Sequence, residues 1–284
     1  MAQMMQDGPQ PSPDQVRRTA KKHAREISSR SRRTSIPVRA RFIRDMGAGT
    51  GEHAETPLKR LVTSGGRDGI TLRLYLALLW KCSASPYDVE IPARLWAELL
   101  GLEPPVETYS RRVNGAVKRL EDANLISVDR RRGKPSVVTL LDESGDGSPY
   151  RPPRGSKDPL DRWVRVPIEL WQGDSFYQLG TPGLAMLLAI LAERNKPNEP
   201  MWWSISQFQR RIGLAPTTRA RGVKQLREAG LLTAERKRLP SVPGSFANDP
   251  VRQTYLLHLG EVATRRRRKR AVDGKGKGSA SAGR

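Results

Sequence analysis

The sequence predicts an α+β fold dominated by helices, in which two copies of one unit lie between two basic tails. The strongest observation is internal similarity: residues 117–126 read VKRLEDANLI and residues 223–232 read VKQLREAGLL, with five identical positions in ten. A Gly-Leu pair precedes each copy, and an apolar segment of helical length precedes each pair. Two segments with the same order of parts are typical of a duplicated domain.

Helix start signals define the first elements of the second copy. An apolar helix opens at Thr181, with Pro182 in its first turn. Residues 201–205 then form a short extended segment. Ser206 is followed three residues later by Gln209, a capping-box spacing that predicts the start of a second helix.

The rest of the second copy predicts a third helix and a hairpin. Gly213 ends the second helix, because glycine tolerates the left-handed conformation found at such ends. Thr217 or Thr218 then caps a third helix, which runs to the next glycine. Residues 231–235 and 251–259 are predicted strands, joined by a loop rich in Arg, Lys, Pro, Ser and Gly.

The first copy repeats this plan, with an apolar helix over residues 72–81 and a short amphipathic run over 92–100. Its strands cover residues 125–128 and 136–141 and flank the basic loop DRRRGKP. The copies differ mainly by six extra residues before the third helix of the first copy. Each copy therefore predicts a helix, a short strand, a helix, a turn, a helix and a basic hairpin.

This order of elements resembles that of winged helix-turn-helix domains over residues 70–142 and 161–260. The resemblance implies that the third helix of each unit enters the DNA major groove. It also implies that each hairpin, the wing, follows the phosphate backbone or enters the minor groove. Two such units on one chain, without a ligand-binding or enzymatic domain, are similar to plasmid replication initiators, in which the units bind a repeated origin sequence.

The charge is strongly positive and unevenly placed. Lys and Arg number 51 against 29 Asp and Glu, a formal net charge of +22, and residues 1–41 and 260–284 carry +7 each. Both ends lack apolar periodicity, so they are predicted to be disordered basic arms. The predicted organisation is a disordered arm over 1–36, a first domain over 37–141, a linker over 142–159, a second domain over 160–260 and a disordered tail over 261–284.

This charge predicts a polyanionic partner, foremost double-stranded DNA, because each cation near a duplex displaces a condensed counterion. The alternative is that the tails serve solubility alone. The apolar stretches are too short to cross a membrane, no small-molecule ligand or cofactor is evident, and self-association is left open. Arginine exceeds lysine by 38 to 13, which favours a bacterial source and a cytoplasmic, nucleoid-associated location.

The candidate DNA-binding residues lie on the outer faces of the third helices and in the hairpins. Arginine and amide side chains on the helices suit bidentate contacts with base edges, and lysines suit phosphate as point charges. The alternative interpretation is an ordinary solvated helix face. In the first copy the candidates are Arg111, Arg112, Asn114, Lys118, Arg119, Arg130, Arg131, Arg132 and Lys134. In the second copy they are Thr217, Thr218, Arg219, Arg221, Lys224, Gln225, Arg236, Lys237 and Arg238.

The sequence does not predict an enzyme. Its three histidines lie far apart, no phosphate-binding loop with a lysine is present, and the segment DESGDG lacks the glutamate that completes a calcium loop. The single cysteine, Cys82, excludes an internal disulfide and a cysteine-based metal site. The competing hypotheses are a transcriptional regulator on an operator and an architectural or adaptor protein whose winged helices bind proteins.

The six tryptophans are predicted to pack in the core rather than to stack on bases, because most lie within apolar patterns. Trp202 and Trp203 are adjacent in a predicted extended segment, so their side chains must point to opposite faces.

Overall fold

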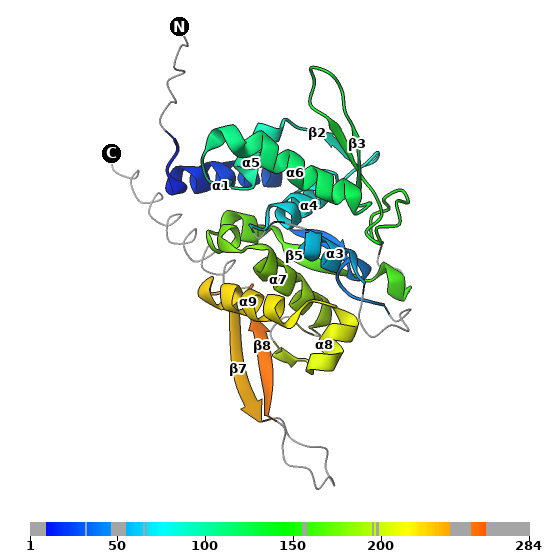
Figure 1. The fold of residues 1–284 in the computed structure, drawn as a ribbon, viewed down its shortest axis with the longest axis vertical. Helices are drawn as coiled ribbons and strands as arrows, with labels where there is room; N and C mark the ends of the chain where they lie inside the picture. Colours follow the sequence, from blue (N-terminus) through cyan, green and yellow to red (C-terminus); the bar gives the residue numbers. More distant parts are fainter. Residues whose placement is uncertain are drawn as a thin grey trace, which may run out of the picture.

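The computed structural model describes residues 10–31, 33–46, 55–64, 66, 68–154, 158–194, 196, 199–238 and 251–259. Over these residues the fold is α+β, as predicted, with helices packed around one two-stranded and two three-stranded antiparallel sheets (Figure 1). Among the described helices, none combines the length and the apolar character that a membrane span requires.

The first unit follows the predicted order of elements. It consists of α4 (Ile70–Lys81), β2 (Asp88–Glu90), α5 (Ala93–Leu99), the 3-10 turn η1 (Val106–Thr108), α6 (Tyr109–Asp122), β3 (Ile126–Asp129) and β4 (Val137–Leu140). The strands pair in the order β2-β4-β3, so the returning strand β4 lies in the middle of the sheet. Helix α4 is buried on all sides except at its last residue, which agrees with its uninterrupted apolar sequence.

The second unit has the same connectivity. It consists of α7 (Thr181–Glu193), β6 (Met201–Trp202), α8 (Ile205–Arg211), α9 (Pro216–Glu228), β7 (Leu232–Arg238) and β8 (Val251–Leu257). Its strands pair in the order β6-β8-β7, the equivalent of β2-β4-β3. The internal similarity of the sequence is therefore matched by a repeat of element order and sheet topology.

Two helix starts differ from the prediction. The capping box of α8 is formed by Ser204 and Gln207, two residues earlier than predicted: Ser204 Oγ accepts from the Gln207 amide at 3.1 Å, and Gln207 Oε1 accepts from the Ser204 amide at 3.2 Å. Both Ser-x-x-Gln spacings exist in the chain, and spacing alone does not choose between them. Helix α9 begins at Pro216 without a side-chain cap, so neither threonine after it caps the helix.

Helix ends agree with the prediction. Gly213 at φ +75° and Gly230 at φ +68° occupy the left-handed region after α8 and α9. Asn124 takes the same conformation at φ +54° after α6, where the second copy has glycine. These positions stop the helices and turn the chain into the following segment.

The two units share one hydrophobic core and are not separate domains. Strand β1 (Ser35–Arg39) pairs with β5 (Trp163–Pro167), and α4 packs against α7. At this junction the Gly69 amide donates to Thr181 Oγ1 at 3.1 Å, and Gly69 adopts φ +75°. A Cβ on Gly69 would lie 2.9 Å from the Leu179 carbonyl oxygen, so only glycine fits.

The first residues of the predicted linker are part of the core. Glu143 is fully buried, and its carboxylate accepts from the Arg39 amide at 2.7 Å and from Arg39 Nη1 at 3.0 Å. Asp142 is buried beside it and accepts from Arg41 Nη2 at 2.7 Å. The prediction of a solvated linker from residue 142 is therefore wrong at its start, because cations from the N-terminal segment bind these buried carboxylates.

The prediction of a disordered arm over residues 1–36 is wrong for residues 13–30, which form α1 (Pro13–Arg30). Ser12 and Gln15 make a capping box at its start, and Val16, Ala20 and Ala24 are buried where α1 packs against α5. The buried face consists of small residues, so it produces little hydropathy signal. The predicted tail over 261–284 and the whole loop between β7 and β8, residues 239–250, lie outside the described residues.

The remaining elements lie before the first unit or between the two units in the chain. Helices α2 (Ala40–Ile43) and α3 (Pro57–Ser64) precede α4, and both pack against α7. The 3-10 turns η2 (Pro159–Asp161), η3 (Ile168–Gln172) and η4 (Ser175–Gln178) lie between β4 and α7.

Most tryptophans pack in the core, as predicted. Trp80, Trp96, Trp171 and Trp203 are buried, and Trp163 is half-buried. Trp202 is exposed while its neighbour Trp203 is buried, so the pair does point to opposite faces.

Candidate nucleic-acid interface

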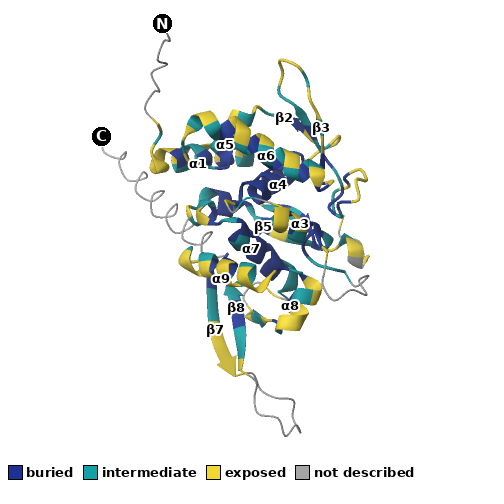
Figure 2. Cartoon of the chain, viewed as in Figure 1, coloured by how far each residue is buried: buried dark blue, intermediate teal, exposed yellow. Residues whose placement is uncertain are grey.

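The third helices of the two units lie on opposite sides of the central helix pair. Helix α6 packs against α4 and α9 packs against α7, while α4 and α7 contact each other in the middle (Figure 1). Figure 2 shows exposed residues along both outer helices. The two hairpins extend away from this centre in opposite directions, so the basic hairpins lie toward opposite ends of the long axis of the molecule.

Helix α6 presents three predicted contact residues to solvent. Arg111 and Asn114 are exposed, and neither side chain has a hydrogen-bonding partner among the described residues. Lys118 is exposed one turn further along and lies 3.0 Å from Asp122 Oδ1. This pair is a solvated i,i+4 interaction, which phosphate can replace at small cost.

Helix α9 presents a similar outer face. Thr217 and Arg221 are exposed, and no described side chain pairs with Arg221. Lys224 occupies the position of Lys118 in the shared motif and pairs with Glu228 at 3.7 Å. The same lysine and the same acidic partner position therefore recur in both units.

Arg119 and Gln225, predicted to point outward, are instead half-buried against the first helix of their units. They occupy equivalent positions in the shared motif. Arg119 Nη1 lies 3.5 Å from Thr71 Oγ1 in α4, and Gln225 Oε1 accepts from the Gly183 amide in α7 at 2.8 Å. The first turn of a helix has free amides, and Gln225 satisfies one of them, which anchors α9 to α7.

Arg219, also predicted to contact bases, lies within an aromatic cluster. Its Nη2 donates to the Tyr255 hydroxyl at 2.9 Å, and its guanidinium carbon lies 4.7 Å from the centre of the Phe208 ring and 5.8 Å from that of Trp203. These contacts link α8, α9 and β8. The half-buried guanidinium is therefore a packing group, and cation–π attraction stabilises it there.

Two further predicted residues are partly withdrawn from solvent. Arg112 is half-buried and donates to the Glu103 carbonyl oxygen at 2.8 Å, across the longer turn of the first unit. Thr218 is half-buried near the start of α9. Neither position presents a free side chain comparable with Arg111 or Arg221.

Ion pairs hold the base of the first hairpin. Arg130 binds both carboxylate oxygens of Glu121 in α6, at 2.9 and 2.5 Å, and Arg131 binds Glu90 in β2 at 2.7 Å. The hydrogen bond from Arg130 lowers the pKa of the Glu121 carboxyl. Arg132 and Lys134 remain exposed on either side of Gly133, which turns the chain at φ +73°.

The second hairpin carries its charge along a strand. Arg236, Lys237 and Arg238 are all exposed at the end of β7, and Lys237 lies 3.2 Å from Glu235. Lys237 lies opposite Arg252 of β8 in the register. The described part of this hairpin is therefore a basic ribbon.

A hollow in each unit brings helix and hairpin residues together. In the first unit a hollow of about 530 Å³ lies between α5, α6 and the hairpin, and its lining includes Asn114, Lys118, Arg130 and Lys134. The equivalent hollow of the second unit measures about 620 Å³, and Arg219 and Arg236 are among its lining residues. Arg111, Arg132 and Arg221 lie outside these hollows.

The structure also shows exposed basic residues that are not among the candidate DNA-binding residues named from the sequence. Arg18, Lys22 and Arg25 are exposed on one face of α1, which packs against α5. The spacing of these residues and the Ser12-Gln15 capping box were the available signals. Arg252 was also missed; its guanidinium carbon lies 5.0 Å from the centre of the exposed Trp202 ring.

Comparison of the chain with protein-family models, with curated proteins and with solved structures finds no match.

Proposed function

We propose that this chain is a non-enzymatic double-stranded DNA-binding protein in which two winged helix-turn-helix units contact one specific site. The observation that carries the proposal is the agreement between the two units. In each, the third helix is fixed to the first helix on one face and presents exposed polar and basic side chains on the other. A repeated exposed basic face is what a pair of major-groove helices requires.

Exposure and side-chain chemistry divide the residues predicted to contact DNA into three groups. Arg111 and Asn114 of α6, and Thr217 and Arg221 of α9, have the exposure that base readout needs. Lys118, Lys224 and the exposed hairpin cations suit phosphate, which positions the protein without reading sequence. Arg119, Arg219 and Gln225 hold the helices in place, so they are no longer proposed as base contacts.

We further propose that the DNA site is a replication origin repeat, so that the protein is a plasmid-type replication initiator. This rests on the tandem arrangement of two units of the same topology and on its similarity to such initiators. Both units share one core, so the two proposed DNA-binding helices have a fixed separation. A fixed separation suits a site whose repeats have a constant spacing.

Selection of the purified full chain on a random duplex library, at roughly physiological salt, tests the proposal. The expected result is one enriched site containing two half-sites. Direct repeats that also occur near the protein's own gene support the initiator role, and a single or inverted site over a promoter supports a transcriptional regulator. Equal recovery of all duplexes contradicts specific recognition and leaves an architectural or adaptor role.

A further inference from the structure

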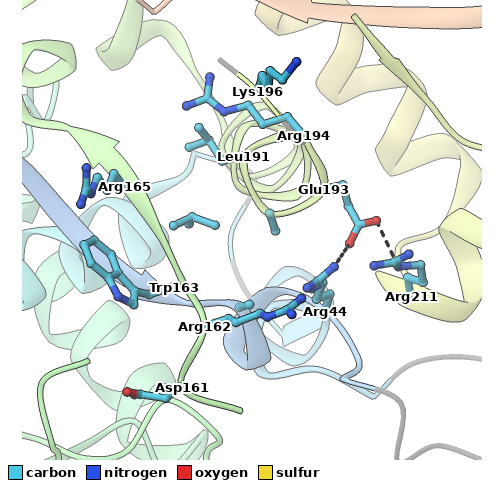
Figure 3. A pocket seen from close by; sticks show the side chains of 13 residues that line it. Arg44, Asp161, Arg162, Trp163, Arg165, Leu191, Glu193, Arg194, Lys196 and Arg211 are labelled. Carbon is cyan, nitrogen blue, oxygen red and sulfur yellow. Dashed lines mark hydrogen bonds and ion pairs between the residues drawn. The ribbon is translucent and has the colours of Figure 1, made fainter. Parts of the chain in front are cut away.

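A basic hollow lies away from the proposed DNA-binding helices. It has a volume of about 760 Å³ and is bounded by α2, β5, the C-terminal end of α7 and Arg211 of α8 (Figure 3). Six of its lining residues are basic, namely Arg44, Arg162, Arg165, Arg194, Lys196 and Arg211, and two are acidic. Helix α9 crosses α7 at the opposite end, near Pro182.

Both acidic residues of the hollow are already bound. Glu193 is almost completely buried and pairs with Arg44 Nη1 at 2.8 Å and with Arg211 Nε at 3.0 Å. Asp161 accepts from Arg39 Nε at 3.3 Å and belongs to the buried cluster around Glu143. Neither carboxylate is therefore available to neutralise the other cations.

Three arginines of the hollow have no acidic partner among the described residues: Arg162, Arg165 and Arg194. In Figure 3, Arg194 lies across the opening from Arg44 and Arg162. Arg194 is half-buried, whereas Arg162 and Arg165 are exposed, and burial lowers the pKa of the Arg194 guanidinium. A partly desolvated cation without a counter-charge is costly, and an anion held between these arginines offsets that cost.

The shape and lining of the hollow suit a compact ligand. Its volume lies within the range of small-molecule sites, and Leu191, Val164 and Ala192 add an apolar surface beside the arginines. Trp163 is half-buried at the rim, with the Arg165 guanidinium carbon 4.9 Å from the centre of its ring. Guanidinium groups bind phosphate oxygens in a bidentate manner, and an aromatic rim can stack on a base.

We infer that this hollow binds a compact polyphosphate, either an inorganic tripolyphosphate or the triphosphate group of a nucleotide, through Arg162, Arg165 and Arg194. The site is separate from the proposed DNA-binding surface and does not rest on the proposed function. Arg44 and Arg211, fixed by Glu193, add positive potential from the other side of the hollow.

Calorimetric titration of the full chain with sodium tripolyphosphate and with ATP, at roughly physiological salt, tests this inference. We expect both to bind the wild type, and the double variant R162Q/R194Q to bind roughly tenfold more weakly or worse. The control is R18Q/R25Q, which removes the same charge from exposed arginines of α1 and should bind as the wild type does. Tripolyphosphate should raise the melting temperature of the wild type but not of R162Q/R194Q.

Tighter binding of ATP than of tripolyphosphate identifies a nucleotide, and equal binding identifies the phosphate chain as the recognised group. The inference is overturned if neither compound binds, or if R162Q/R194Q and R18Q/R25Q bind equally. It is also overturned if a short DNA duplex displaces tripolyphosphate and if R162Q/R194Q weakens the binding of DNA and of tripolyphosphate to the same extent. The hollow would then belong to a DNA-binding surface. The variant R111A/R221A distinguishes this inference from the proposed function. It should lose DNA binding while its binding of tripolyphosphate stays intact.

Discussion

Arg219 and Arg221 are two residues apart on α9, yet they have different environments. Arg219 packs in the aromatic cluster and donates to Tyr255, whereas Arg221 is exposed and unpaired among the described side chains. We therefore expect R221A to weaken binding to the selected DNA site by about 1–3 kcal/mol, with an unchanged melting temperature. We expect R219A to lower the free energy of unfolding by about 1–3 kcal/mol.

Fluorescence anisotropy with a labelled duplex and urea denaturation measure the two effects separately. If R221A binds DNA as the wild type does, the outer face of α9 is not the contact surface. If R219A retains full stability, the aromatic cluster does not depend on its guanidinium.

The buried Glu143 makes a pH-dependent contribution to stability. Burial raises the pKa of this carboxyl to about 7, although the hydrogen bonds from Arg39 oppose the shift. The folded protein therefore holds this proton more tightly than the unfolded chain does. The stabilisation that Glu143 contributes through this proton is complete below the pKa of the carboxyl in the unfolded chain. It is lost as the pH rises through about 7, the pKa in the folded protein.

We expect the free energy of unfolding of the wild type to fall, relative to that of E143Q, by about 1–3 kcal/mol between about pH 5 and pH 8. The side-chain amide in E143Q cannot titrate, and its oxygen can still accept from the Arg39 amide. Urea denaturation at a series of pH values measures the difference. Parallel pH profiles for the two proteins would show that Glu143 keeps its ordinary pKa.

At the scale of elements, the crossing of α9 over α7 depends on a glycine. A Cβ on Gly222 would overlap the Pro182 carbonyl oxygen and the Met186 side chain, whereas a Cβ on Gly115 of α6 would meet nothing closer than Arg119 Nη1 at 3.7 Å. We expect G222A to lower the free energy of unfolding by about 1–3 kcal/mol. The matched substitution G115A should raise it by about 0.5–1 kcal/mol, because alanine favours the helix.

Thermal and urea denaturation of both variants measure this difference. An equal effect of the two substitutions would mean that α9 does not lie in close contact with α7.

The elements of each unit were predictable because local signals mark their limits. Glycines in the left-handed conformation end α8 and α9, and apolar sequences identify α4 and α7. Helix α1 was missed because its buried side chains are small, although its capping box was visible in the sequence. The exact start of α8 was also missed, because two overlapping spacings satisfied the same rule.

The site residues were predictable only where exposure follows from helical periodicity. Arg111, Lys118, Arg221 and Lys224 are exposed as predicted. Periodicity could not show that Gln225 reaches the first turn of α7, since that contact joins residues 42 positions apart. Long polar side chains at the edge of a buried face can turn inward when a free amide or an aromatic cluster lies within reach.

At the scale of the whole molecule, the junction between the units was not predictable. Strand β1 pairs with the distant strand β5. Arg39 binds Glu143, which lies 104 positions further along the sequence. Nothing local in the sequence indicates these pairings. Their consequence is that the two proposed DNA-binding helices belong to one packed body and not to two tethered domains.

A packed body predicts strict spacing between half-sites. Insertion of about five base pairs rotates one half-site by roughly half a helical turn relative to the other. We expect this insertion to reduce affinity to that of a single half-site, because the shared core prevents the units from adjusting. Titration of the native and the expanded duplexes measures the effect, and equal affinity would indicate independent units.

The most direct test of the central claim is to compare the DNA sites selected by two double variants. R111A/N114A alters only α6, and T217A/R221A alters only α9. If each unit reads its own half-site, each variant should lose sequence preference in a different half of the site while keeping it in the other. If both variants select the wild-type site unchanged, or if neither they nor the wild type select any site, the two helices do not read DNA.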